Sequence, residues 1–294
     1  MRIALTGATG FIGRHFVPEA IQAGHSVVPL TRSPKETARQ TDYSVASLAK
    51  VFDGCNAVVH LASERPSGEW TFEQYVANVG MTQNVLDASV LLRITNVVIM
   101  SSRSVYSIYN ERPWRESSEL IPMNLYGASK AAMETMGAHY SAFRGLHCKS
   151  LRLAQVLGWG EQGGYMMSTF LERALSGKPL MVHGRGEGKR EYIYVRDVVS
   201  GILSALSHPA VNGIFNIGTG TTTSIFDLAH LVCEVFGASG NVERVPDAAE
   251  DVNTYVMDVE RARRELHWTA RYSVRDALVE MKRDLDQQQI RSTL

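Results

Sequence analysis

Tyr126 and Lys130, four positions apart in the segment YGASK, are the residues best suited to chemistry. On a helix this spacing places both side chains on one face. A tyrosine with an ordinary pKa of about 10 is a poor acid or base near neutral pH, and a neighbouring ammonium group lowers that pKa by favouring the phenolate. The pair therefore predicts proton transfer by Tyr126, tuned by Lys130. A surface pair without chemistry is the alternative interpretation.

Two serines precede this pair in the chain. Ser101 and Ser102 follow an apolar segment that is typical of a buried strand. Open α/β sheets place their ligands at that end of the strands. We therefore expect Ser102 to hydrogen-bond a substrate oxygen while Tyr126 moves its proton. A nicotinamide would then take or give hydride at the same carbon.

The glycines of the segment TGATGFIG predict a dinucleotide site. Gly7, Gly10 and Gly13 lie between a short apolar strand and a segment with helical spacing. Glycines in this setting allow a tight turn, the approach of a pyrophosphate to backbone N–H groups, and close packing of the helix on the sheet. We expect Thr9, Phe11 and Ile12 to contribute to the same site. A turn whose glycines serve only backbone geometry is the alternative.

The residues after the second strand bear on which dinucleotide is bound. Folds that prefer NAD place an acidic residue there, which accepts hydrogen bonds from the ribose 2′-hydroxyl. This chain has Thr31 and Arg32 instead. A guanidinium pairs with a 2′-phosphate in a bidentate fork, so the sequence favours NADP over NAD, with Arg14 as a second partner of that phosphate. Arg32 as a solvated loop residue is the alternative.

An alternation of strands and helices must position these residues. Apolar segments predict strands at residues 1–6, 26–30, 56–62, 96–101, 150–154 and 212–217, and helical spacing predicts helices at residues 11–22, 75–91, 126–143, 170–175, 195–206, 225–236 and 274–285. Apolar strands separated by helices imply an α/β fold, a Rossmann-type doubly wound parallel sheet.

Four glycines within residues 158–164 predict a change of architecture after this sheet. We expect an NAD(P)-binding domain over residues 1–160, to which residues 192–218 return. A smaller C-terminal α+β substrate-binding lobe would then comprise residues 161–191 and 219–294.

Composition and charge exclude several classes of protein. The 294 residues are 45% hydrophobic and carry no net charge, so a large core needs no disulfides and no global field attracts nucleic acid or an acidic membrane. Three scattered cysteines fit a reduced compartment and match no metal-ligand spacing. With no membrane span or signal segment in view, we expect a cytoplasmic protein without a metal site.

Eight segments, taken in order, resemble the extended short-chain dehydrogenase/reductases, in the epimerase/dehydratase group that works on sugar nucleotides. They are TGATGFIG, DGCNAVVHLAS, VANVGMTQNVLDA, VVIMSSRSVYS, YGASK, LRLAQVLGWG, GKREYIYVRDV and GIFNIGTG. The resemblance implies that Ser102, Tyr126 and Lys130 form a catalytic triad and that the protein is a homodimer built on the helices at residues 75–91 and 126–143. It further implies cofactor contacts from Leu61, Ala62, Ser63, Asn78 and Asp42, and substrate contacts from Ser102, Arg103, Ser104, Gln155 and Arg190, with Arg190 on the diphosphate of a nucleotide sugar.

Departures from the family pattern limit the reaction. Arg103 and Ser104 stand where 4,6-dehydratases of this family carry an Asp-Glu pair, so we do not expect dehydration. Ser104 also replaces the cysteine of enzymes that both epimerise and reduce. Gln155 replaces a common asparagine, and residues 247–254 lack the second phosphate-binding arginine of many 4-epimerases. A different nucleotide, or a substrate without one, therefore stays open.

Two reactions remain within the same chemistry. A 4-epimerase oxidises the sugar and reduces it again with its own cofactor, whereas a 4-ketoreductase uses exchangeable NADPH, which Arg32 favours. A reductase of a non-nucleotide carbonyl compound and a non-catalytic NADP-binding regulatory protein are the other candidates.

Overall fold

The computed structural model describes residues 1–33, 38–64, 69–161, 165–237, 242–246 and 248–293. Its centre is a seven-stranded sheet with the order β11-β6-β5-β4-β1-β2-β3, in which all neighbours are parallel. The strands are β1 (Arg2–Thr6), β2 (Ser26–Thr31), β3 (Arg39–Gln40), β4 (Ala57–His60), β5 (Asn96–Ser102), β6 (His147–Leu153) and β11 (Gly213–Ile217). The chain order reverses between β1 and β4, which confirms the predicted doubly wound sheet.

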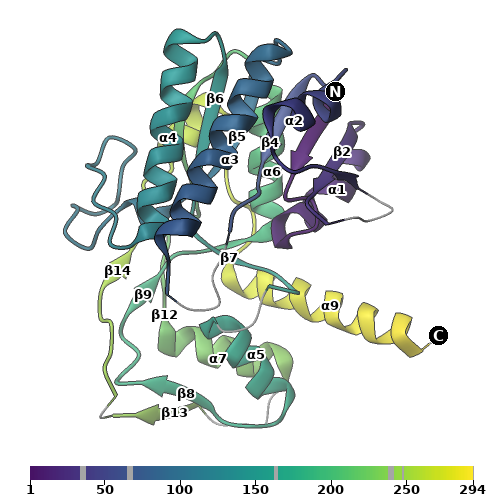
Figure 1. Cartoon of the computed structure of the whole chain (residues 1–294). Helices are drawn as coiled ribbons and strands as arrows, with labels where there is room; N and C mark the ends of the chain where they lie inside the picture. Colours follow the sequence, from purple (N-terminus) through teal and green to yellow (C-terminus); the bar gives the residue numbers. More distant parts are fainter. Residues whose placement is uncertain (34–37, 65–68, 162–164, 238–241, 247, 294) are drawn as a thin grey trace.

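Helices cover both faces of this sheet (Figure 1). One face carries α1 (Phe11–Gln22) and α6 (Val195–Ser207), and the other carries α2 (Val45–Phe52), α3 (Phe72–Leu91) and α4 (Leu125–Phe143). Within β1 the side chains alternate, because Ile3 and Leu5 enter the first core and Ala4 enters the second. Burial on both faces explains why these strands read as continuous apolar segments.

A smaller lobe lies below the sheet in Figure 1 and has its own apolar core. Its elements are α5 (Met166–Leu175), β8 (Leu180–His183), β9 (Lys189–Arg190), β12 (Thr223–Ser224), α7 (Ile225–Phe236), β13 (Val242–Val245), β14 (Thr254–Tyr255) and α9 (Val274–Thr293). The short elements β7 (Gln155–Leu157), β10 (Tyr192–Tyr194), α8 (Glu260–Glu265) and the 3₁₀ turn η1 (Arg103–Val105) complete the chain. The proposed domain boundaries stay a prediction.

Differences from the predicted elements have local causes. The predicted strand at residues 56–62 ends at His60, because the Ala62 N–H donates to the Thr6 side chain (3.2 Å) instead of a neighbouring strand. The helix α2 was not predicted, since eight residues are too few for the helical period to stand out. Part of the glycine-rich segment, residues 162–164, lies outside the described residues. Across the described ranges no helix is long and apolar enough to span a bilayer.

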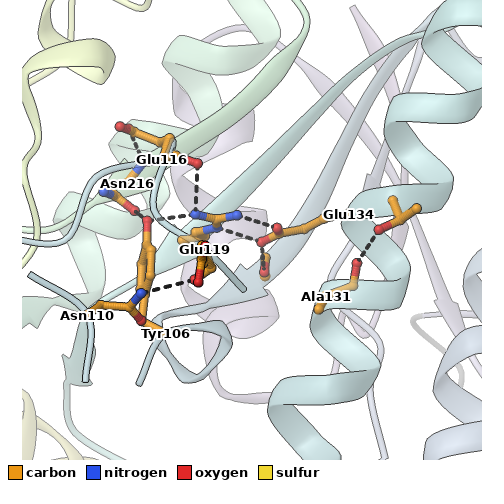
Figure 2. Close-up of polar contacts among 10 residues, drawn as sticks. Tyr106, Asn110, Glu116, Glu119, Ala131, Glu134 and Asn216 are labelled. Carbon is orange, nitrogen blue, oxygen red and sulfur yellow. Dashed lines mark hydrogen bonds and ion pairs between the residues drawn. The ribbon is translucent and has the colours of Figure 1, made fainter. Parts of the chain in front are cut away.

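A buried polar network joins four elements beneath the ligand end of the sheet (Figure 2). The guanidinium of Arg152 on β6 donates to both oxygens of Glu134 on α4 (2.9 and 2.7 Å) and to the hydroxyl of Tyr106 (2.7 Å). Tyr106 in turn donates to Asn216 on β11 (2.7 Å), and Ser101 on β5 donates to Glu134. Burial alone would lower the pKa of Arg152, but the Glu134 carboxylate reverses the effect and raises it. The network therefore fixes α4 against β5, β6 and β11.

Replacing Glu134 by Ala should lower the free energy of unfolding by about 3–5 kcal/mol, because it leaves the Arg152 charge buried without its carboxylate. Both side chains are only 1% exposed. Urea denaturation of E134A and of the double variant E134L/R152M measures this, and we expect the double variant to be the more stable of the two. The exposed pair Arg263–Glu260 provides the control, since E260A should change little. A loss below about 1 kcal/mol in E134A would contradict a structural role for the pair.

Candidate active site

A cavity of about 880 Å³ opens at the carboxyl ends of the central strands. It brings together most of the residues predicted from the sequence: Gly7, Thr9, Gly10, Phe11, Ile12, Gly13, Arg14, Thr31, Arg32, Leu61, Ala62, Ser63, Ser102, Arg103, Ser104, Tyr126, Lys130 and Gln155. The glycine turn and the serine, tyrosine and lysine therefore share one cavity. Asp42, Asn78 and Arg190 are not among the residues that line it.

The glycine turn has the shape that a dinucleotide requires. Gly7 has a φ of 68°, and a Cβ there would lie 2.7 Å from the Ala62 nitrogen. A Cβ on Gly13 would lie 2.7 Å from the Ala8 Cα. Gly10 caps α1 without a side chain, and the first residues of α1 line the cavity, so a pyrophosphate could approach the N-terminus of this helix. These residues fit the pyrophosphate of a dinucleotide.

The two arginines predicted to meet a 2′-phosphate already have protein partners. The Arg32 guanidinium forms an ion pair with Glu64, although 61% of its side chain is exposed. Arg14 donates to the carbonyl of Gly160. Glu64 had no signal in the sequence, because its approach to Arg32 depends on how the loops after β2 and β4 meet. A 2′-phosphate would have to compete with the Glu64 carboxylate for Arg32.

A buried chain of polar groups supports the loop at residues 61–64, which lines the cavity. His60 lies 2.8 Å from the Thr6 hydroxyl and 3.1 Å from the Thr82 hydroxyl. Asn78 on α3 accepts hydrogen bonds from the N–H of Glu64 (2.7 Å) and from the hydroxyl of Ser63 (3.3 Å). Asn78 is only 1% exposed, so in this structure it holds the loop from behind rather than facing the cavity.

The groups expected to do chemistry come from β5 and from the start of α4. Asn124 caps α4 by accepting a hydrogen bond from the Gly127 N–H (2.8 Å). The Lys130 ammonium donates to the Met100 carbonyl (3.0 Å) and lies 5.6 Å from the centre of the Tyr126 ring. Ser102 ends β5, and its hydroxyl donates to the Ser104 hydroxyl (3.2 Å). Strand β5 thus carries Ser102 and also anchors the lysine beside Tyr126.

Several cavity residues escaped sequence reasoning. The Trp70 ring packs against the Tyr126 ring with centroids 4.7 Å apart and planes inclined by 30°. Tyr43 lines the cavity where Asp42 was expected. The Asp42 carboxylate instead accepts a hydrogen bond from the Ser44 N–H (2.8 Å), close to the start of α2. Glu161 and Tyr165 also line the cavity. None of these residues belongs to a spacing pattern, so tertiary contacts alone reveal them.

Of the residues predicted to contact a substrate, some line the cavity and Arg190 does not. Gln155 begins β7 and lines the cavity, as do Arg103 and Ser104. Arg190 lies on β9, where its guanidinium pairs with Asp251 (2.8 Å). The guanidinium carbons of Arg103 and Arg190 lie 4.8 and 4.3 Å from the centre of the Tyr255 ring. The roles of these residues toward a substrate stay predictions.

Comparison with known proteins gives consistent matches. The sequence model of the NAD dependent epimerase/dehydratase family matches residues 3–218. A solved UDP-N-acetylglucosamine 4-epimerase from Bacillus cereus is 32% identical with a TM-score of 0.91, covering 97% of this chain and 96% of that chain. The solved structure of MoeE5 with UDP-glucuronic acid and NAD is 30% identical with a TM-score of 0.83, covering 97% and 100%. The curated dTDP-glucose 4,6-dehydratase of Streptomyces griseus is 27% identical over 94% of this chain and 91% of its own length.

The buried His60 should make the fold sensitive to acid. Burial, and secondarily the Lys130 charge, lower the pKa of His60 to about 3, below its ordinary value of about 6.5. As pH falls between these two values, the unfolded chain binds a proton that the folded chain excludes. The contribution of His60 to the free energy of unfolding should therefore decrease as the pH is lowered, by at most about 1.4 kcal/mol per pH unit.

Urea denaturation of the wild type and of His60→Gln between pH 7 and pH 4 measures this contribution. We expect a shallower loss of stability with acid in the variant, because glutamine takes up no proton. The same substitution at the exposed His183 serves as the control and should leave the profile unchanged. Parallel profiles for H60Q and the wild type would contradict the assignment.

Proposed function

Because the chain belongs to the NAD dependent epimerase/dehydratase family, we propose that it is an NAD(P)-dependent enzyme that transfers hydride at a carbon of a nucleotide sugar. One observation carries the proposal: a single cavity joins the glycine turn to Ser102, Tyr126 and Lys130. The volume of about 880 Å³ lies in the range of ligand-binding cavities in proteins. Two solved structures similar to this chain are described as a UDP-N-acetylglucosamine 4-epimerase and as a complex with UDP-glucuronic acid and NAD, which supports a nucleotide sugar as the substrate.

The chain's own residues would bind and deprotonate the substrate. Ser102 hydrogen-bonds the reacting oxygen, and Tyr126 takes the hydroxyl proton during oxidation and returns it during reduction. Lys130, held by the Met100 carbonyl, favours the phenolate of Tyr126 by its positive charge. The Trp70 ring packs against the Tyr126 ring at a tilt and restricts its orientation. When bound, the nicotinamide supplies hydride transfer to or from the same carbon.

The reaction that we favour is 4-epimerisation, and 4-ketoreduction is the second candidate. Epimerase names among the similar proteins support the first, and Arg32 at the cofactor cavity supports the second. Dehydration is disfavoured even though a similar curated protein is a 4,6-dehydratase, because Arg103 and Ser104 offer no acid and base pair beside Ser102. A homodimer through α3 and α4 stays a prediction.

Tyr126→Phe should reduce turnover by about 10²–10⁴-fold, because it removes the group that moves the proton. Interconversion of UDP-sugar 4-epimers in the presence of NAD, and NADPH consumption with a 4-keto sugar nucleotide, measure the two candidate reactions. Cofactor affinity should be retained in Y126F, and Tyr109→Phe, which alters a side chain 79% exposed, should have wild-type activity. Unchanged turnover in Y126F would contradict the mechanism.

We further infer that the cofactor site accepts NADP and NAD and that Arg32 favours NADP. The Glu64 carboxylate opposes this preference, since it pairs with Arg32 and would repel a 2′-phosphate. Glu64→Gln should therefore increase the affinity for NADP relative to NAD by about 10-fold, the amount that one charge-assisted contact supplies.

Calorimetric titration of both cofactors into the wild type, E64Q and Arg32→Gln measures the preference. Arg32→Gln should lose the NADP preference, with the affinity for NAD unchanged. Tighter binding of NAD than of NADP by both the wild type and E64Q would overturn the inference.

A further inference from the structure

The segment that follows β7 contacts the first turns of α1, and we call its residues 158–160 the strap. The Arg14 guanidinium on α1 donates to the carbonyl of Gly160 in the strap. The same guanidinium lies 5.7 Å from the centre of the Phe11 ring, about one helical turn earlier. A backbone carbonyl carries no net charge, so Arg14 holds the strap by a charge-assisted hydrogen bond and not by an ion pair.

His15 provides a second contact between α1 and the strap. Burial lowers the pKa of His15, whereas a hydrogen bond with the backbone of Trp159 raises it. The His15 ring also meets the Phe11 ring edge to face, with centroids 5.6 Å apart. Phe11, Arg14 and His15 lie at positions i, i+3 and i+4, so one face of α1 supplies all three side chains.

The two glycines of the strap permit this close approach. A Cβ on Gly158 would lie 2.7 Å from the Phe11 Cζ and 2.7 Å from a methyl group of Val195 at the start of α6. Gly160 has a φ of 83°, and a Cβ there would lie 2.8 Å from the Arg14 guanidinium. Residues with a Cβ rarely adopt such a positive φ. The strap therefore fits against α1 because both positions are glycine.

The strap forms part of the wall of the cavity. Gly160 lines the cavity, and so do Phe11 and Arg14 on the facing helix. Glu161 and Tyr165 continue the lining beyond the strap. The N-terminus of α1 is where we expect the pyrophosphate of a dinucleotide to bind. The contact between Arg14 and Gly160 therefore borders that part of the cavity.

The strap also lies where the sheet meets the smaller lobe (Figure 1). Trp159 packs against the apolar core of the smaller lobe, as do Phe11 and Ile12 on α1. Val156 on β7, just before the strap, packs against this core and against the first core of the sheet. Movement of the smaller lobe away from α1 would therefore pull on the strap and on its contact with Arg14.

We propose that Arg14 is a positioning residue that holds the strap against α1, and that opening of the strap limits the rate at which the dinucleotide enters and leaves. The inference rests on the proposed function, because it places a dinucleotide at the glycine turn. The strap opens when the hydrogen bond between Arg14 and Gly160 breaks. Loop opening of this kind limits the rate of ligand release in many enzymes.

A closed strap suits 4-epimerisation better than 4-ketoreduction. In epimerisation the nicotinamide that accepts hydride from the sugar carbon returns it to the same carbon, so the cofactor stays bound between turnovers. A ketoreductase consumes one reduced cofactor for each product and must release the oxidised form every time. Slow exchange of the cofactor would therefore limit the second reaction and not the first.

Stopped-flow measurement of NADH binding tests the proposal. The fluorescence of bound NADH gives the association rate when NADH is mixed with the enzyme, and the dissociation rate when the loaded enzyme is mixed with excess NAD. Arg14→Met removes the donors and keeps an apolar stem, Arg14→Lys is the conservative variant, and Gly160→Ala alters the strap without changing a charge. Arg263→Met, at a side chain 65% exposed on α8, is the matched control. The melting temperature of each variant verifies that it is folded.

We expect both rates to rise by about 10-fold in Arg14→Met and in Gly160→Ala, the amount that one charge-assisted hydrogen bond supplies. Arg14→Lys should lie closer to the wild type, and Arg263→Met should have wild-type rates. The double variant should be no faster than Arg14→Met, because the same contact is already lost. Faster association is the decisive result, since removal of a cation that only binds phosphate would slow the association of an anion.

Faster dissociation with unchanged or slower association, in either Arg14→Met or Gly160→Ala, would overturn the gating role of the strap. Wild-type values of both rates in either variant would overturn it as well. These outcomes leave the proposed function intact. A wild-type protein that binds neither NADH nor NADPH would instead contradict the proposed function, and the role of the strap with it.

Discussion

The bidentate ion pair between Arg152 and Glu134 is the interaction on which the site's geometry depends. Helix α4 carries Tyr126 and Lys130 near its start and Glu134 one turn further along, so the pair locks the helix against β6. Ser101 donates to the same carboxylate, which fixes the end of β5 where Ser102 stands. The same buried contact therefore positions Tyr126 and Lys130 on α4 and Ser102 on β5 relative to each other.

The chain has no net charge, but several of its charged side chains each contact a specific partner. Arg152 has Glu134, Arg190 has Asp251, and Lys130 has the Met100 carbonyl. Buried charges survive only with such partners, because an uncompensated charge is expensive to remove from water.

Local signals predicted the parts of the site that local structure determines. The glycine turn follows from one strand and one helix, and the Tyr126–Lys130 spacing follows from one helical turn. Residues from separate loops or elements meet in three contacts: the ion pairs Arg32–Glu64 and Arg190–Asp251, and the ring contact between Trp70 and Tyr126. No spacing within one segment encodes such contacts. The sequence therefore predicted the Rossmann-type sheet and most of the residues that share the cavity, whereas the ion pairs of Arg32 and Arg190 emerged only from the fold.

We propose that hydride passes between a nicotinamide and a sugar-nucleotide carbon in this cavity. A single-turnover experiment examines this step: the enzyme is loaded with NAD or NADP in its oxidised form, mixed rapidly with excess UDP-sugar, and followed in the absorbance band of reduced nicotinamide. We expect a transient rise in that band that depends on Tyr126. Binding of both ligands without any appearance of reduced nicotinamide, across the sugar nucleotides tested, would contradict it.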